Sequence, residues 1–120
     1  MIQGVGTDIV EIDRMARAVK RPAFLRKCFT AAEIARCEAS GAKSAQNFAG
    51  YFAAKESVAK ALGTGFRGIS PRDIEICHNN VGKPFASIAS NAAIGAGLRC
   101  EISISHGRDH AVAFAVIFKE

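Results

Sequence analysis

The sequence predicts a single compact domain built from both helices and strands, and three observations support this prediction. The chain has 120 residues, 49% of them hydrophobic, which is enough to bury a sizeable core and too few for a second domain to be expected. A helical pattern between Phe48 and Gly65 has strand-like segments before and after it along the chain. No internal repeat, linker or low-complexity segment interrupts the sequence. We therefore expect residues 1–120 to form one domain.

Charge and cysteine content narrow the possible partners. Sixteen Lys and Arg against eleven Asp and Glu give a net charge of +5, which favours an anionic partner such as a phosphate ligand, an acidic protein, nucleic acid or anionic lipid. The four cysteines show no C-x-x-C spacing, and the chain carries no signal peptide and no apolar run long enough to cross a membrane. We therefore expect a cytoplasmic protein whose cysteines are reduced thiols.

A strand rich in β-branched residues is expected over residues 2–12. Gly4, Gly6 and Asp8 fall on alternate positions of it, so one face of the strand lacks bulk and ends in a carboxylate. Such a face indicates that something approaches the backbone closely. A helix packed on the strand, with Asp8 at a turn, and a ligand site at Asp8 both agree with this spacing.

A basic helix is expected next, over residues 14–21, with Asp13 as its N-cap and Pro22 as its stop. Three arginines align on its outer face: Arg14, Arg17 and Arg21. Six of the sixteen basic residues lie between positions 14 and 27, which is more than a solvated face usually carries. The stripe is therefore either a docking surface for an acidic partner or a solvated face.

Two more helices are expected between residues 30 and 63. Thr30 and Glu33 make a capping box for a short helix that ends near Gly41. The long helix from Phe48 has its apolar residues on one face at about 100° per residue, and Gly63 supplies the left-handed residue that ends it.

Three charged residues of the long helix stand out. Lys55 points into the apolar face, whereas Glu56 and Lys60 lie one turn apart on the adjoining face, behind small side chains. An ordinary i, i+4 surface pair, worth roughly 0.2–0.5 kcal/mol, is the simpler interpretation of Glu56 and Lys60 when the helix is taken alone. A ligand site is the alternative, and the rest of the chain has to decide between them.

The second half of the chain is expected to be loops and strands. Residues 63–68 read G-T-G-F-R-G, a loop of the kind that cradles phosphate, although at a helix C-terminus the helix dipole does not attract anions. Ser70 and Asp73 predict a capped single turn, and a small-residue helix is expected over 90–97. Strands are expected over 74–77, 84–88, 100–106 and 110–118.

The last two of these strands form a pair, and the final one is nearly all apolar and therefore central or buried. His106 shares a face with Ile102 and Ile104, at a core position or at its rim. We find no Ser-His-Asp order, zinc-ligand spacing or Walker-type loop, so the sequence does not support a hydrolase of those types, a zinc protein or a P-loop enzyme.

Four segments together carry a resemblance to one family. They read G-V-G-T-D-I-V-E-I-D-R at 4–14, F-A-A-K-E-S-V-A-K-A-L-G-T-G at 52–65, G-K-P at 82–84 and I-S-I-S-H at 102–106. In this order they resemble the bacterial holo-acyl-carrier-protein synthases, of the 4′-phosphopantetheinyl transferase type, over essentially the whole chain. The resemblance implies an α+β domain with antiparallel strands packed on a long central helix. It also implies a homotrimer with active sites between subunits, for which the Ala- and Gly-rich last strands offer apolar surface.

The resemblance implies an enzyme of fatty acid biosynthesis. It would transfer 4′-phosphopantetheine from coenzyme A, its substrate, to a serine of apo-acyl carrier protein and release 3′,5′-ADP. The metal would be Mg²⁺, with Mn²⁺ as a substitute, held by Asp8 and Glu56, because Mg²⁺ takes one or two carboxylates together with phosphates and water. Lys60 would contact the phosphates, so these three are the expected catalytic residues and catalysis would be mainly positioning and electrostatics.

Further coenzyme A contacts are implied at positions that match the family's blocks: Gly63, Thr64, Gly65, Lys83, Ser105 and His106. One departure concerns Tyr51, because the family commonly has an arginine immediately before the F-A-A-K-E block. Either another cation compensates, for which the candidates are Lys43, Lys55 and Arg67, or coenzyme A binds more weakly.

The resemblance also assigns a partner to the basic stripe, since carrier proteins of this pathway are strongly acidic and would dock on Arg14, Arg17 and Arg21. Two alternatives belong to other classes. A basic nucleic-acid-binding module is favoured by the charge, but the chain has no RNP aromatic block, KH loop or zinc signature. A magnesium phosphohydrolase would use the same carboxylates and pass the phosphoryl group to water. We expect neither nucleic acid nor a membrane as partner.

Overall fold

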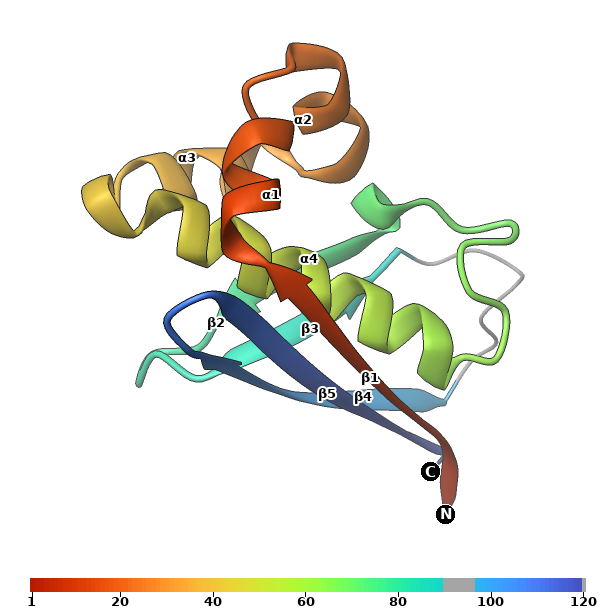
Figure 1. Cartoon of the computed structure of the whole chain (residues 1–120). Coiled ribbons are helices and arrows are strands. Elements are labelled where there is room, and N and C mark those ends of the chain that lie inside the picture. Colours follow the sequence, from red (N-terminus) through yellow and green to blue (C-terminus); the bar gives the residue numbers. More distant parts are fainter. Residues whose placement is uncertain (90–96, 120) are drawn as a thin grey trace.

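An antiparallel sheet forms one layer of the molecule, and the long helix α4 lies across it (Figure 1). The structure is a computed structural model that describes residues 1–89 and 97–119. Three strands pair in the order β1-β5-β4: β1 is Ile2–Glu11, β5 is His110–Lys119 and β4 is Leu98–His106. The nearly all-apolar last strand is therefore central, as the sequence predicts.

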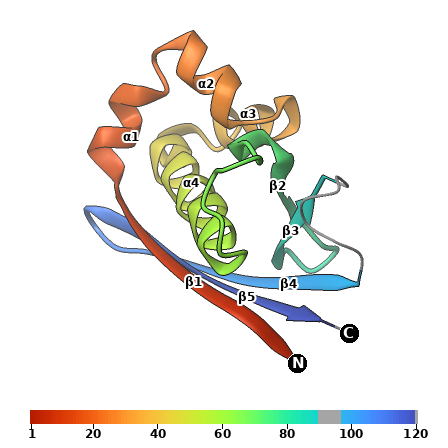
Figure 2. The same cartoon turned by 90° about the vertical axis from the view of Figure 1, so that its right-hand side faces the viewer.

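The helices lie on one face of this sheet. They are α1 (Ile12–Ala18), α2 (Pro22–Cys28), α3 (Ala31–Glu38) and α4 (Ser44–Ala61). A separate antiparallel hairpin consists of β2 (Ile74–His78) and β3 (Pro84–Ile88). Figure 2 shows α1 on one side of α4 and this hairpin on the other. The predicted α+β class, with antiparallel strands on a long central helix, is confirmed.

Small residues let α4 lie directly on the sheet. A Cβ at Gly4 would collide with the backbone oxygen of Ala61, and a Cβ at Gly6 with that of Ser57. The central strand presents three fully buried alanines to the same helix: Ala111, Ala113 and Ala115. The bare face of β1 is therefore explained by the close approach of α4, which brings the last turn of α4 next to Asp8.

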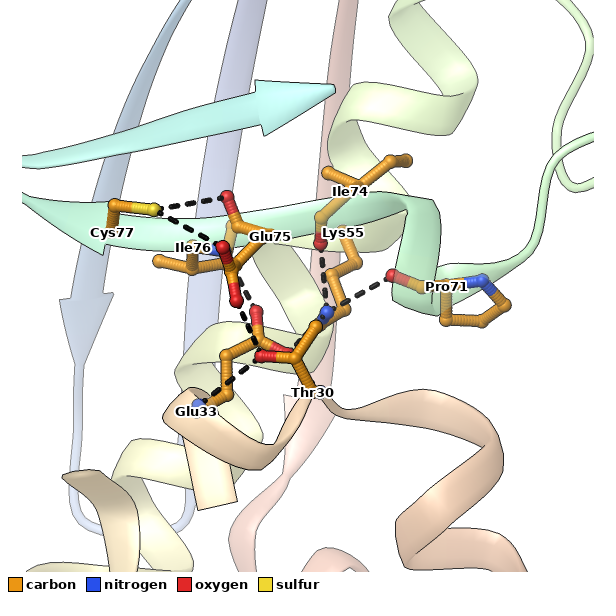
Figure 3. A network of polar contacts seen from close by, with 8 residues as sticks. All are labelled: Thr30, Glu33, Lys55, Pro71, Ile74, Glu75, Ile76 and Cys77. Atoms are coloured by element: carbon orange, nitrogen blue, oxygen red, sulfur yellow. Dashed lines mark hydrogen bonds and ion pairs between the residues drawn. The ribbon is translucent and has the colours of Figure 1, made fainter. Parts of the chain in front are cut away.

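A buried ion pair joins α3, α4 and the start of β2 (Figure 3). The ammonium of Lys55 donates to Glu33 Oε1 at 2.7 Å and to the backbone oxygens of Pro71 at 3.0 Å and Ile74 at 2.7 Å. The other oxygen of Glu33 accepts the N–H of Ile76 at 2.7 Å. Lys55 points into the core, as predicted, but all three of its donors are used there. It therefore cannot replace the arginine missing at Tyr51, and that candidate is wrong.

The start of the chain differs from the prediction in its helix boundaries. Helix α1 begins at Ile12 with Glu11 at the N-cap, so Asp13 is an acidic residue of the first turn rather than the cap. The helix ends at Ala18, and Pro22 opens a second helix, α2, which the pattern of apolar residues does not reveal. Proline at the first position of a helix is favourable because its missing N–H would have no partner there.

Other local predictions agree with the structure. The Thr30–Glu33 capping box is present at α3, and Ser70 and Asp73 form a second one at the single turn Pro71–Asp73. Gly63 has a φ of 84° where α4 ends. The helix expected over 90–97 falls outside the described residues except at Gly97. Within the described part of the chain, no helix is long and apolar enough to cross a membrane.

Candidate active site

Asp8 lies on the face of β1 that packs against α4, and Lys60 reaches across to it. The ammonium of Lys60 donates to Asp8 Oδ1 at 3.1 Å and to the backbone oxygen of Thr7 at 3.0 Å. The Asp8 side chain is 16% exposed and that of Lys60 is 51% exposed. Lys60 therefore makes its ion pair between two elements instead of along its own helix with Glu56.

Glu56 stands one turn before Lys60 and is partly buried. Burial raises the pKa of Glu56, the negative charge of Asp8 raises it further, and Lys60 lowers it. Two carboxylates that repel each other, with the exposed ammonium of Lys60 beside them, make a site that would favour a divalent cation.

Magnesium fits this donor set. In residues 1–89 and 97–119, no cluster of three or more His, Cys, Asp or Glu could enclose a metal by itself. Mg²⁺ does not require such a cluster, because it commonly keeps several waters and binds one or two carboxylates together with substrate phosphates. Asp8 and Glu56 are the carboxylates available for that role.

Two adjoining cavities open on Glu56. One, of about 400 Å³, is lined by Asp8, Glu56, Arg14 and Arg21 among others. The other, of about 690 Å³, has mostly apolar walls that include Phe66 and Ile69. Phe24, Phe52 and Glu56 line both cavities. Glu56 thus stands where a charged cavity meets an apolar one, and Asp8 lines the charged cavity beside it.

Helix α2, which the sequence pattern missed, completes this region. It supplies Phe24 to both cavities, and Arg21 at its N-cap places its guanidinium 5.5 Å from the centroid of the Phe24 ring. The predicted stripe of three arginines on one helix is therefore corrected, because Arg21 lies beyond the end of α1. Arg14, Arg17 and Arg21 are all exposed, and Arg17 does not line the cavity. Pro22 was the signal that could have revealed α2.

The glycine-rich loop follows Lys60 at the C-terminal end of α4. The N–H of Gly63 donates to the backbone oxygen of Lys60 and that of Gly65 to the backbone oxygen of Ala59. These two amides therefore cap the helix. The hydroxyl of Thr64 donates to the oxygen of Gly65 at 3.1 Å. The loop lies at the same end of α4 as Lys60, but it presents no cradle of free amides at 63 and 65.

The remaining predicted contacts lie on the β4 side of α4. Asp8 pairs with Ala113 of the central strand, which pairs with Ile104 on its other side, so β1 and β4 are opposite edges of the sheet. Lys83 forms an exposed ion pair with Glu101 at 3.0 Å. Ser105 alternates with Ile104 along β4, so it points to the sheet face away from α4, and it is exposed.

His106 lies at the rim of the core, against α4. A Cβ at Gly50 would collide with its Nε2. Burial lowers the pKa of His106, and a hydrogen bond with the backbone of Gln46 acts in the opposite direction. One chain thus brings Asp8, Glu56 and Lys60 together and leaves Lys83, Ser105 and His106 on another side.

Comparison with other proteins shows similarity along nearly the whole chain. Residues 4–115 match the model of the 4′-phosphopantetheinyl transferase superfamily. A holo-[acyl-carrier-protein] synthase of Clostridium novyi is 48% identical over 98% of this chain and 88% of its own length, and one of Clostridium acetobutylicum is 48% identical over 98% of both. The crystal structure of a holo-(acyl-carrier-protein) synthase from Bacillus anthracis in complex with CoA (3′,5′-ADP) matches with a TM-score of 0.86 at 34% identity, covering 100% of this chain and 99% of that one.

Proposed function

Because the chain belongs to the 4′-phosphopantetheinyl transferase superfamily, we propose that Asp8, Glu56 and Lys60 form the centre of its active site. The protein is an enzyme of the holo-[acyl-carrier-protein] synthase type, which transfers 4′-phosphopantetheine from coenzyme A to a serine of apo-acyl carrier protein and releases 3′,5′-ADP. The observation that supports this centre is the meeting of the carboxylates of Asp8 and Glu56, which line one cavity together, with the exposed ammonium of Lys60, which pairs with Asp8 at 3.1 Å.

Asp8 and Glu56 would hold Mg²⁺, for which Mn²⁺ could substitute. A bound metal would supply positive charge to the diphosphate, in which the carrier serine attacks the β-phosphorus, the bond to the bridging oxygen breaks and 3′,5′-ADP leaves. The two side chains come from different elements, so the packing of α4 on Gly4 and Gly6 sets their separation before any ligand arrives. Such preorganised charge is usually the largest contribution to a reaction of this kind.

Lys60 would bind the diphosphate directly. Its side chain is half exposed, and among the described residues its ammonium donates to two oxygens, those of Asp8 and Thr7, so it can turn to a phosphate at low cost. The apolar cavity on the other side of Glu56 suits the uncharged pantetheine arm, because Phe52 and Phe66 offer it a dry wall. The Gly63-Thr64-Gly65 loop would lie beside the nucleotide.

The acidic carrier protein would dock on Arg14, Arg17 and Arg21. Arg14 and Arg21 line the cavity that contains Asp8, so a carrier held by them would present its serine to the carboxylates. Complementary charge of this kind mainly raises the association rate. We place the reaction in the cytoplasm, where the four free thiols of the chain would stay reduced.

We further propose that the protein acts as a homotrimer with active sites between subunits. The sheet face away from α4 exposes large apolar side chains: Val5 is 56% exposed, Ile9 62%, Val112 39% and Phe114 46%. Apolar surface gathered in this way favours burial against another copy. Lys83, Ser105 and His106 would then serve the site of a neighbouring subunit. Light scattering checks the assembly, and a monomeric mass in an active preparation would contradict it.

One experiment separates this function from its alternatives. Apo-acyl carrier protein is incubated with coenzyme A, Mg²⁺ and the enzyme, and the carrier is weighed by mass spectrometry. A gain of one phosphopantetheine group on the carrier is expected. A phosphohydrolase would instead consume coenzyme A without modifying the carrier, and a nucleic-acid-binding module would do neither.

A further inference from the structure

One backbone oxygen of the central strand accepts hydrogen bonds from both neighbours of the proposed metal ligands. The oxygen of Ala113 in β5 accepts from the hydroxyl of Ser57 in α4 at 3.1 Å and from that of Thr7 in β1 at 3.1 Å. Thr7 immediately precedes Asp8, and Ser57 immediately follows Glu56. This oxygen therefore joins the two chain segments that carry the carboxylates.

Ser57 is buried where α4 meets the sheet. Together with Glu33 and Lys55, it makes up the buried polar or charged residues in the described part of the chain. Its hydroxyl also lies 2.8 Å from the backbone oxygen of Ala53, one turn earlier in α4. Because a serine hydroxyl has one proton, that proton is shared between an acceptor in the helix and one in the sheet. Only the bond to Ala113 links two elements.

Small residues form the contact of α4 with β1 and β5. They are Gly4 and Gly6 of β1 and Ala111, Ala113 and Ala115 of β5. Their packing fixes how closely the helix approaches the sheet. It does little to fix where the helix stands along the strands, because apolar attraction has no preferred direction and these residues have no long side chains to interdigitate. A hydrogen bond does prefer one distance and angle, so the hydroxyls supply that alignment.

Lys60 makes a second polar link between α4 and β1 at this level. Its ammonium donates to Asp8 Oδ1 and to the backbone oxygen of Thr7. Under the proposed function this ammonium turns to a phosphate, so the link opens when the substrate binds. The hydroxyl of Ser57 is fully buried and cannot exchange its acceptor for a ligand. The bond from Ser57 to Ala113 is therefore the link that persists during the reaction.

We propose that the hydroxyls of Ser57 and Thr7, through the backbone oxygen of Ala113, hold the two carboxylates in the alignment that a divalent cation requires. The inference rests on the proposed function, which assigns Asp8 and Glu56 to Mg²⁺ or Mn²⁺. Both hydroxyl residues are positioning residues, because each acts through the carboxylate next to it in the chain. Mg²⁺ demands near-ideal octahedral geometry, so a small displacement of one carboxylate weakens its binding.

Binding of Mn²⁺ alone tests the proposal without any turnover. The electron paramagnetic resonance signal of free Mn²⁺ is followed as protein is added without coenzyme A or carrier, which gives the Kd. Ser57→Ala should raise this Kd roughly tenfold, the lower end of the range for residues that orient metal ligands. In transfer assays the Mg²⁺ concentration for half-maximal turnover should rise by a similar factor, whereas turnover at saturating Mg²⁺ should stay near that of the wild type.

Thr7 offers a matched pair of variants at an exposed position, where folding is not at risk. Thr7→Val removes the hydroxyl at nearly constant volume and should raise the Kd for Mn²⁺ roughly threefold, the effect of one modest hydrogen bond. Thr7→Ser keeps the hydroxyl and should keep the wild-type Kd. Ser57→Ala combined with Thr7→Val should bind Mn²⁺ hardly more weakly than Ser57→Ala alone, because the link between the two segments is already broken.

Ser40→Ala is the control for the loss of a hydroxyl as such. The hydroxyl of Ser40 donates to the backbone oxygen of Cys37 at the end of α3, and Ser40 lines neither of the cavities that open on Glu56. This variant should keep the wild-type Kd for Mn²⁺. Urea denaturation of every variant is measured in parallel, so that a change in Mn²⁺ affinity is separated from a loss of stability.

The possible results separate the positioning role from the metal site itself. An unchanged Kd in Ser57→Ala or in Thr7→Val would overturn the proposal, and so would equal losses in Thr7→Val and Thr7→Ser. If Ser57→Ala does not fold, the two variants of Thr7 decide. A wild type that binds no Mn²⁺, or an Asp8→Ala variant that binds it as tightly as the wild type, would overturn the proposed metal site and the inference with it.

Discussion

Two lysines of α4 each face a carboxylate, and their surroundings could hardly differ more. Lys55 and its partner Glu33 are both 0% exposed, and the protein satisfies every donor of the ammonium. The side chain of Lys60, five residues later, is 51% exposed, and its hydrogen bonds within the described part of the chain go to Asp8 and one backbone oxygen. Both belong to the one stretch F-A-A-K-E-S-V-A-K.

The difference shows which charge is available for chemistry. A buried ammonium must be fully paired, because leaving a charge unpaired in the interior is very costly, so Lys55 cannot exchange its partners for a phosphate. Desolvation lowers the pKa of Lys55, and the charge and hydrogen bond of Glu33 oppose that shift. An exposed pair such as Lys60–Asp8 is worth little to stability and can open. Lys55 therefore holds the fold, and Lys60 is free to act on a substrate.

The largest effect is expected at the carboxylates beside Lys60. Asp8→Ala and Glu56→Ala should each lower turnover by at least roughly a hundredfold, because each removes a preorganised charge from the centre. Both variants should keep the far-ultraviolet circular dichroism of the wild type. EDTA should abolish the turnover of the wild type, and added Mg²⁺ or Mn²⁺ should restore that turnover. If either variant turned over at nearly the wild-type rate, the assignment of Asp8 and Glu56 as metal ligands would be contradicted.

The buried side of the comparison is tested by stability. Lys55→Met should lower the free energy of unfolding by about 3–5 kcal/mol, because it leaves the Glu33 carboxylate buried without its cation. Urea denaturation at neutral pH measures the loss. Adding Glu33→Gln to Lys55→Met should cost less than the sum of the two single changes, since the unpaired charge is then gone. Additive losses would mean that the two side chains do not act as a pair.

A smaller effect is expected where charge acts at longer range. Arg14 and Arg21 line the cavity of Asp8, so changing them would disturb both substrates. Arg17 is exposed and lies outside that lining, which makes it the cleaner probe of carrier docking. Arg17→Glu should raise the KM for carrier protein severalfold at low salt and leave that for coenzyme A unchanged. The effect should fade at physiological salt, where the Debye length is about 8 Å. An unchanged carrier KM at low salt would make Arg17 part of a solvated face.

The smallest expected effect is the pH dependence that Glu56 gives to the free energy of unfolding. The raised pKa of Glu56 means that its ionised form destabilises the metal-free fold. That cost is absent below the unfolded pKa of the carboxyl and grows as the pH rises through the higher folded pKa. Glu56→Gln should therefore gain slightly in unfolding free energy over the metal-free wild type at neutral pH, and the gain should vanish in acid. Urea denaturation in EDTA at several pH values follows the difference. If the gain in unfolding free energy were the same in acid as at neutral pH, it would not come from the ionisation of Glu56.

The sequence revealed the local features of this site better than its long-range ones. The glycines of β1, the Thr30–Glu33 box and the inward direction of Lys55 follow from side-chain spacing within one element. The partners of the two lysines cannot be found from such spacing, because Asp8 lies 52 residues before Lys60 and Glu33 lies 22 residues before Lys55. Only the packing of α4 decides which charges meet. Helix α2 was missed for a different reason, since Pro22 can mark the stop of the preceding helix although proline also suits the first position of a new one.

The most direct test changes Lys60 alone. In Lys60→Met, the free energy of unfolding is measured in urea and the rate of phosphopantetheine transfer to apo-acyl carrier protein is measured by mass spectrometry. We expect stability within about 1 kcal/mol of the wild type, because an exposed ion pair contributes little. We also expect transfer to fall by roughly a hundredfold through loss of the phosphate contact. Transfer at the wild-type rate would contradict the assignment of Lys60 to the active centre, and a large loss of stability would contradict its separation from the structural pair of Lys55 and Glu33.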